Sequence, residues 1–438
     1  MQESRGLFAQ FAKFSSATIA SLMVFSLYSI VDGLFVARGI GEYAMSAVNL
    51  AVPFMNVLFS IAVLFAVGTS TIIAIYLGQG KGERANSLFS QNLALLVVIG
   101  LAISAAVFLF PQPFAQLLGA KDVTLSYATD YLKGLAPFAV CFIVSYNMEV
   151  LVKTDGYPHL AIITVVIGCL TNCVLDYVMI FIWNWGTWGA AFATGLSQFL
   201  TCIIYLAHFL GRKSTFHLVR FRVDWQIYRR LIPIGIADGV TELCNGLMIF
   251  LFNHTILRCI GQDGLVSYTI IAYTNTLIIN IMLGVSQGTQ PLVSYQYGKG
   301  ERNNYIKLLR YGLTTVDCVA VIGFGLLYLL APQLVQAFLG TDSPALNAYS
   351  VGAFHRYSLC YLLLGFNIMI GGFLTAVERP KPAIAISTGR GLLIQGSCLL
   401  ALAAIFGGDS IWFAPVISEA ICLAAAILFL RAFKKNNG

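Results

Sequence analysis

Residues 80–84 read Gly-Lys-Gly-Glu-Arg, and residues 298–302 read Gly-Lys-Gly-Glu-Arg again. The two copies lie 218 positions apart in a chain of 438 residues, and each follows a long apolar stretch. Other landmarks keep nearly the same shift, such as Asn147 and Asn367, which are 220 positions apart. The repeat predicts a chain made of two copies of one unit.

Apolar stretches of 20 or more residues recur along the chain, and each is long enough to cross a bilayer core about 30 Å thick. Hydrophobic residues make up 58% of the sequence and charged residues 10%, against about 25% charged in a typical soluble domain. This composition is typical of a membrane protein. Twelve helices are expected, at residues 10–37, 46–77, 88–110, 127–154, 159–182, 190–211, 228–257, 267–297, 307–331, 345–376, 382–406 and 411–432.

Each copy of the repeat therefore holds six helices, and because six is even, both copies enter the membrane from the same side. We predict an all-α membrane protein with 12 transmembrane helices in two pseudo-symmetric six-helix bundles around a central cavity. Residues 1–215 would form the N-terminal lobe and residues 216–438 the C-terminal lobe. The long connection at residues 212–230 alternates basic and apolar residues, so it is expected on the anionic inner leaflet, with a specific partner site as the alternative.

The formal net charge is +7, and its distribution gives the orientation. Twenty Lys and Arg residues fall in the expected inner connections, against Arg38, Lys121, Lys133 and Arg258 in the outer ones. This bias predicts a multi-pass protein of a prokaryotic cell (inner) membrane with both termini in the cytoplasm. The charge therefore does not require a nucleic-acid partner.

Two acidic residues lie within apolar stretches of the first half. Asp32 lies in YSIVDGLFV, and Asp176 lies in CLTNCVLDYVMIF with Asn172 one helical turn before it. An ionised acid at the centre of a membrane helix costs roughly 2.5–3.5 kcal/mol, so such residues usually line a polar cavity or bind a cation. The alternative is an acid that bonds to a neighbouring helix as a packing contact. At the repeat shift Asp32 corresponds to Phe252, so this acid is peculiar to the first half.

Further polar residues lie in the expected helices. Glu149, in the fourth helix, has no acidic counterpart in the second half. Asp238 and Glu242 are one turn apart in the seventh helix and cannot both be ionised cheaply. Arg390 either pairs with an acid, which neutralises both groups, or serves function. The second half has its own set of polar residues in expected helices, which is Asp238, Glu242, Asp317, Arg390 and Glu419.

These motifs together resemble the multidrug and toxic compound extrusion (MATE) transporters of the multidrug, oligosaccharidyl-lipid and polysaccharide flippase superfamily. The resemblance covers essentially the whole chain. It rests on Val31-Asp32-Gly33-Leu34-Phe35-Val36 with Gly39-Ile40-Gly41, the Gly-Lys-Gly-Glu-Arg loop in both halves, Asn172-x-x-x-Asp176, and Gly186-x-x-Gly189-Ala190-Ala191-x-Ala193-Thr194. It implies two six-helix bundles around a central cavity, and exchange of a cationic or amphipathic compound against H+ or Na+.

The resemblance also implies which residues act. Prokaryotic relatives use an acid of the first helix, an Asn and an Asp of the fifth and a Thr of the sixth, which match Asp32, Asn172, Asp176 and Thr194. Glu149 matches an acid in the fourth helix of some drug exporters, and Glu242 lies near a seventh-helix acid of others. Relatives often bend their first helix at a proline, and this first helix has none. The tenth helix lacks the acid of sodium-coupled relatives, so no cation site is expected in the second lobe.

We therefore predict a secondary antiporter that exports cationic or amphipathic small molecules. Asp32, Asn172, Asp176 and Thr194 would bind the coupling ion, H+ or Na+, and Glu149, Asp238 and Glu242 are possible substrate or proton sites. One alternative is a flippase for a lipid-linked oligosaccharide or other amphipath, which Arg390 favours, and another is a channel or receptor. No nucleophile–base pair, phosphate loop or metal-ligand spacing is present, so no enzyme activity, metal site or cofactor beyond the coupling ion is expected. The expected partners are the lipid bilayer and the substrate, with the chain acting as a monomer.

Overall fold

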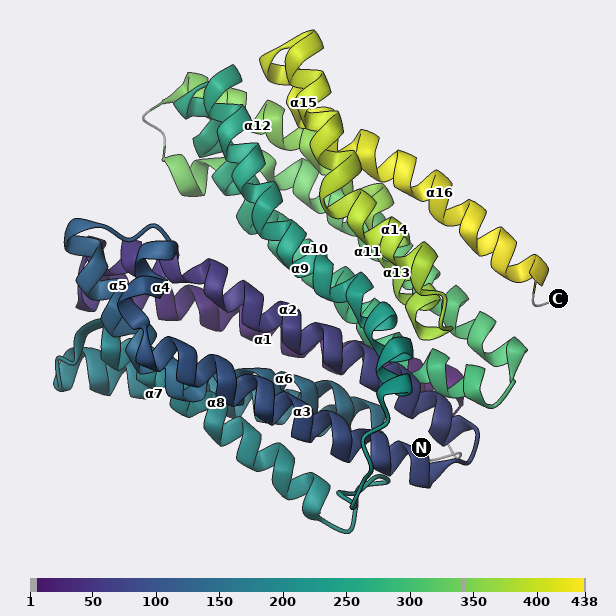
Figure 1. Cartoon of the computed structure of the whole chain (residues 1–438). Coiled ribbons are helices and arrows are strands. Elements are labelled where there is room, and N and C mark those ends of the chain that lie inside the picture. The colour runs from purple at the N-terminus through teal and green to yellow at the C-terminus, as the bar shows by residue number, and fades with distance from the viewer. Residues whose placement is uncertain (1–5, 341–342, 437–438) are drawn as a thin grey trace. The chain divides into compact units, whose positions relative to one another are not determined.

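The computed structural model describes residues 6–340 and 343–436, and within these ranges the chain is helical and contains no β-strand (Figure 1). Twelve helical spans in the described ranges are long and apolar enough to cross a membrane. This number confirms the sequence prediction. Membrane spans are helical because backbone N–H and C=O groups find no water in the hydrocarbon core and must bond within the segment.

Eight helices and two short irregular turns make up the first half of the chain, with α4 between the third and fourth spans. Their bounds are α1 Leu7–Gly39, α2 Glu42–Gly78, α3 Gly82–Leu109, α4 Pro111–Leu117, α5 Asp122–Leu135, a 3-10 turn Ala136–Phe138, α6 Ala139–Thr154, α7 Pro158–Asp176, a π-helical turn Tyr177–Ile182, and α8 Gly186–Leu210, before α9 Trp225–Cys259 begins the second six. The fourth span joins α5, the 3-10 turn and α6, and the fifth joins α7 to the π-helical turn.

The second six spans continue from α9 in the same pattern. Their further bounds are α10 Gln262–Gly298, α11 Arg302–Leu339, α12 Pro344–Ser358, α13 Tyr361–Ala376, α14 Pro380–Thr388, a π-helical turn Gly389–Leu393, α15 Ile394–Phe406, a 3-10 turn Gly408–Phe413, and α16 Ala414–Asn436. The tenth span joins α12 and α13, and the eleventh joins α14, the π-helical turn and α15.

Contacts divide the chain into two compact units. Unit 1 is built mainly from Ala20–Gly239 with Ser294–Glu301, and unit 2 from Leu7–Ile19, Val240–Val293 and the chain from Arg302 onward. Three boundaries therefore lie inside α1, α9 and α10, and a further one lies between α10 and α11, at Glu301 and Arg302. The division of the repeat at residues 215 and 216 stays a prediction.

The backbone explains why glycines recur at the repeat shift. Gly80 and Gly300, in the two Gly-Lys-Gly-Glu-Arg loops, have φ angles of +72° and +76°. Gly41 and Gly261, which follow the first and seventh helices, have φ angles of +119° and +99°. Only glycine adopts this left-handed region without a steric cost. The same turns therefore recur at a shift of 220, although the Gly-Lys-Gly-Glu-Arg motif repeats at 218, so that Gly80 is the first residue of its copy and Gly300 the third.

Each unit has its own apolar core. In unit 1, α6 packs against α2 and α8, while α5 packs against α2 and α8. In unit 2, α13 packs against α11 and α16, and the side chains of Tyr361 and Trp412 are completely buried there. The functional side chains described below are held on these packed helices.

The ends of α2 and α10 approach each other closely within unit 1. A Cβ atom on Gly78 would overlap the carbonyl oxygen of Tyr295, and one on Gly298 would overlap that of Ile75. Gly78 and Gly298, like Ile75 and Tyr295, are related by the repeat shift of 220. The two glycines therefore allow backbone-to-backbone packing where any larger residue would separate the helices.

Candidate functional site

The two acids of the first half lie together in unit 1. Asp176 is the last residue of α7, and its side chain is completely buried, as is that of Asn172 one turn earlier at 1% exposure. Asp32 lies in α1 and is partly buried. α7 begins at Pro158, whose fixed φ and missing N–H suit the first helical position. The sequence thus sets the start of the helix that carries Asn172 and Asp176.

A π-helical turn, Tyr177–Ile182, follows Asp176 directly. The end of α1 packs on this turn. A Cβ atom on Gly39 would overlap the Ile180 side chain and crowd the Phe181 ring, and the rings of Phe35 and Phe181 meet edge to face at 5.9 Å. This packing fixes α1 beside the end of α7. π-Helical turns are rare and often occur at functional sites.

The four residues of the predicted coupling site are neighbours. The carboxyl group of Asp176 lies close enough to that of Asp32 and to the Asn172 side chain for electrostatic interaction. The Asn172 amide Nδ2 donates to the Thr194 hydroxyl at 3.3 Å, and that hydroxyl donates to the Ala190 carbonyl at 3.0 Å. Thr194 therefore orients Asn172, and Thr194 is itself held by a backbone carbonyl of α8.

Four buried oxygen atoms of this cluster have no hydrogen-bond partner among the described residues. They are Oδ1 of Asp32, both carboxylate oxygens of Asp176, and Oδ1 of Asn172. A buried acceptor without a partner is costly, and two carboxylates that face each other repel. Carboxylate, amide and hydroxyl oxygens are the groups that hold a hard cation. The cluster is chemically suited to take up a proton or a small cation.

Two tyrosines complete the surroundings of the acids. Tyr28 of α1 and Tyr131 of α5 both interact electrostatically with Asp32 and Asp176. Sequence reasoning missed both residues. Tyr28 precedes Asp32 by one helical turn on the same face, which is a signal that could have found it. Tyr131 has no such signal, because its position depends on how α5 packs in unit 1.

Glu149, a possible substrate or proton site, has a basic partner. Its Oε1 accepts a hydrogen bond from Lys153 Nζ at 2.7 Å, one turn further along α6. The Glu149 side chain is 16% exposed and that of Lys153 is 7% exposed. The pair is therefore largely buried and neutral as a whole.

The two acids of the seventh span fall on different sides of a unit boundary. Asp238 belongs to unit 1 and Glu242 to unit 2, and both are partly buried on the continuous helix α9. Asp317, the ninth-span acid, is exposed on α11.

Arg390 is paired in unit 2. Its Nε donates to Glu419 Oε1 at 3.3 Å, and Asn367 Nδ2 donates to the other carboxylate oxygen at 2.6 Å. The side chains of Arg390 and Glu419 are 13% and 6% exposed. Of the two alternatives left open by the sequence, the structure therefore shows the ion pair.

Comparisons with known proteins give the family. The MatE family model matches residues 17–178 and 239–395. The chain is 23% identical over 427 residues to the multidrug export protein MepA of Staphylococcus saprophyticus, covering 93% of this chain and 91% of that protein. A second such protein, from Staphylococcus haemolyticus, is 23% identical over 448 residues and covers 99% and 95% of the two chains.

Solved structures show the same fold. A MATE family transporter described as a multidrug resistance protein in an outward-facing conformation matches with a TM-score of 0.91 at 20% identity, over 98% of this chain and 96% of that one. A transporter of the same superfamily from Pyrococcus furiosus, described as having a binding pocket of reversed polarity, matches with a TM-score of 0.89 at 21% identity, over 98% and 96%. Sequence and fold agree, and the chain belongs to the MatE family of multidrug efflux transporters.

Proposed function

We propose that this chain is a secondary antiporter that exports cationic or amphipathic small molecules in exchange for H+ or Na+. The supporting observation is the cluster of Asp32, Asn172 and Asp176 with its four buried, unpartnered oxygen atoms. The name of the staphylococcal relatives, multidrug export protein, supports the substrate class. The charge bias supports cytoplasmic termini in the cell membrane.

The coupling step follows from electrostatics. When the site faces outward, a proton or Na+ binds between Asp32 and Asp176 and relieves the repulsion of their carboxylates. Thr194 holds the Asn172 amide in place during this step. Ion binding thus changes the charge of a buried site, which favours a different conformation and release of the exported compound.

The driving force has two parts. Inward movement of one positive charge gains about 2.3 kcal/mol per 100 mV of membrane potential. A tenfold pH gradient adds about 1.4 kcal/mol if the ion is a proton. If one monovalent cation leaves for each ion that enters, the electrical part cancels. Export then depends on the chemical gradient alone.

The test is efflux of a fluorescent monovalent cation from proteoliposomes with H+ and Na+ gradients imposed separately. Asp32→Asn and Asp176→Asn should each abolish gradient-driven export while the protein still folds. Asp130→Asn removes an exposed acid of α5 in the same unit and should leave export unchanged. Undiminished export by both site variants would refute the coupling site, and a wild-type protein that accumulates nothing against a gradient would favour a channel.

A flippase for a lipid-linked oligosaccharide would need a free cationic group to bind the pyrophosphate of its substrate. The Arg390 guanidinium is engaged by Glu419 in unit 2, and the cluster in unit 1 is acidic. Both observations favour an exported cation over an anionic lipid-linked sugar.

A further inference from the structure

The connection between α8 and α9, residues 211–224, is irregular but firmly attached to unit 1. At its start, the Thr215 backbone N–H donates to Asp155 Oδ1 at 2.7 Å, and the Thr215 hydroxyl bonds to the same oxygen. The other Asp155 oxygen is bonded to His208 Nε2 at 2.7 Å. Asp155 is only 3% exposed, so its charge is directed at these partners.

An aromatic cluster holds the next residue. Phe216 is completely buried, and its ring lies 5.2 Å from that of Phe89 and 5.4 Å from that of Phe209. Phe89 belongs to α3 and Phe209 to the last turn of α8. The connection is therefore anchored between two membrane-spanning helices.

The remainder of the connection is bonded along α3 by its backbone. The N–H groups of His217, Val219 and Asp224 donate to side-chain oxygens of Asn86, Ser90 and Gln91 at 2.9, 2.8 and 3.2 Å. The segment is held in one extended path rather than left as a loose linker.

All side chains from residue 217 to residue 226 are exposed. Val223 and Trp225 are 54% and 69% exposed, and Arg220 and Arg222 alternate with the apolar residues. We call residues 217–226 the exposed strip. An extended segment that presents both apolar and basic side chains at the ends of membrane helices fits the boundary between hydrocarbon and anionic head groups.

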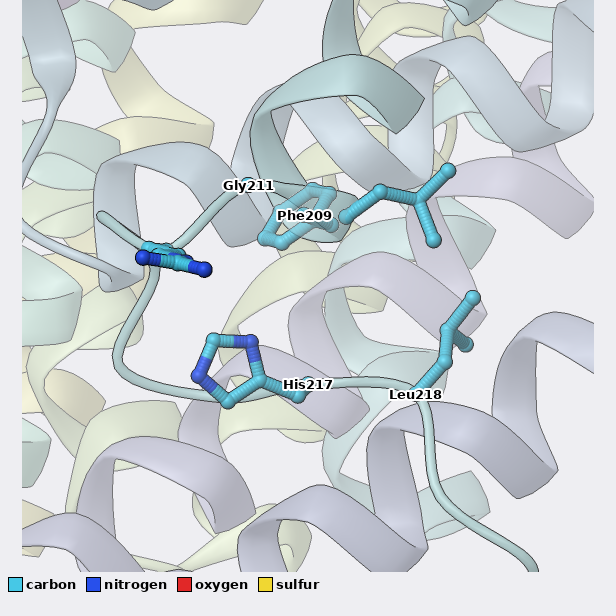
Figure 2. Close-up of a pocket in the computed structure, with 6 residues that line it drawn as sticks. Phe209, Gly211, His217 and Leu218 are labelled. Carbon is cyan, nitrogen blue, oxygen red and sulfur yellow. The ribbon is translucent and has the colours of Figure 1, made fainter.

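A cavity of about 410 Å³ lies beside the exposed strip. Figure 2 shows His217 and Leu218 on one side of the chain's loop and Phe209 and Gly211 on the other. The lining residues are Phe209, Leu210, Gly211, Arg212, His217 and Leu218. The lining thus combines a guanidinium and an imidazole with three apolar side chains.

We propose that the exposed strip and this cavity bind an anionic phospholipid of the inner leaflet. Arg212 would contact the phosphate, and Leu218 would contact the adjoining glycerol and acyl carbons. A guanidinium binds phosphate oxygens in a bidentate manner, and the apolar lining favours a lipid over a free phosphate. Asp155 does not compete for the head group, because His208 and Thr215 already engage its carboxylate.

The test uses Trp225 as a reporter. The protein is placed in bilayers that contain either brominated phosphatidylglycerol or brominated phosphatidylcholine, and tryptophan quenching is measured. The chain has five tryptophans, so the Trp225→Phe variant is measured in parallel and the difference isolates Trp225. We expect stronger quenching of Trp225 by phosphatidylglycerol, and a preference that falls as ionic strength rises because salt screens the attraction.

The triple variant Arg212→Gln/Arg220→Gln/Arg222→Gln should have a weaker preference for phosphatidylglycerol over phosphatidylcholine. The preference should fall by about fivefold for each arginine that contacts the anionic membrane surface. Arg258→Gln removes an exposed arginine at the end of α9 in unit 2 and should not change it. A preference that survives in the triple variant overturns the proposal. Equal quenching of Trp225 by the two lipids in the wild-type protein, or quenching by neither, also overturns the proposal. This measurement does not depend on whether the triple variant folds.

A last arm separates a lipid from a free phosphate. Inorganic phosphate and glycerol phosphate are added to the wild-type protein at constant ionic strength. The proposal expects no change in Trp225 quenching, because neither compound carries acyl chains. Displacement of the brominated phosphatidylglycerol by either compound would show a free-phosphate site and overturn the lipid assignment.

Discussion

Arg390→Met should destabilise unit 2, because it leaves the Glu419 charge buried without its basic partner. The Nε–Oε1 distance is 3.3 Å and the two side chains are 13% and 6% exposed. At that distance and an effective dielectric constant of about 20, the attraction is roughly 5 kcal/mol. Desolvation offsets most of it in the intact pair, so the pair itself contributes little net stability. Removal of one partner, however, costs about 3–5 kcal/mol.

The double variant Arg390→Met/Glu419→Gln should recover most of that loss. It removes both charges, and the amide carbonyl that replaces the Glu419 carboxylate would still accept the hydrogen bond from Asn367, which is 2.6 Å long in the wild-type protein. Thermal unfolding in detergent can be followed by the reaction of the buried Cys360 and Cys422 with a fluorogenic maleimide, in a background in which the other eight cysteines are replaced by serine. Both thiols lie near Glu419, so they report on this part of unit 2.

The matched control is an exposed pair of the same kind. Arg356 Nη1 lies 3.0 Å from Asp409 Oδ2, but these side chains are 38% and 54% exposed. Arg356→Met should therefore cost no more than about 1 kcal/mol. If Arg390→Met were no worse than this control, or the double variant no better than the single one, the reasoning from burial would be refuted. Normal export by the double variant would further show that the pair is structural.

Three further predictions concern single positions. Phe216→Ala should cost about 3–5 kcal/mol and make residues 211–224 sensitive to protease, whereas Phe221→Ala at a 36% exposed site should do neither. Gly298→Ala should lower the unfolding temperature because its Cβ would overlap a backbone carbonyl; Gly325→Ala, where a Cβ meets nothing within 4 Å, should not. Tyr131→Phe should weaken ion-driven export without changing the unfolding temperature, which efflux and unfolding measurements on one preparation will check.

Much of the fold was predictable from the sequence because the bilayer restricts the solutions. A span must be apolar and helical, so the count of spans follows from hydropathy. Gly41 and Gly261 recur in the repeat because both turns need a positive φ. The grouping of Asp32 with Asp176 was expected from the cost of burying acids and from the family resemblance.

Other features depend on packing that no local pattern records. The π-helical turn after Asp176 has no sequence signature, and Tyr131 reaches the acids only because α5 packs against α2 and α8. The Arg390–Glu419 pair was left open because 29 positions separate the two residues. Lys153, by contrast, is one turn from Glu149, and the i to i+4 rule could have predicted their pairing.

The unit boundaries that fall inside α1, α9 and α10 have a mechanical consequence. Relative movement of the two units must bend three continuous helices, whose axial hydrogen bonds resist curvature, rather than swing freely on loops. α10 carries Pro291 two residues before its boundary, and α9 carries Pro233 six residues before its own, so both are softened by a missing N–H. α1 contains no proline, so its axial hydrogen bonds are not interrupted in this way, and we expect it to resist bending more than α9 and α10.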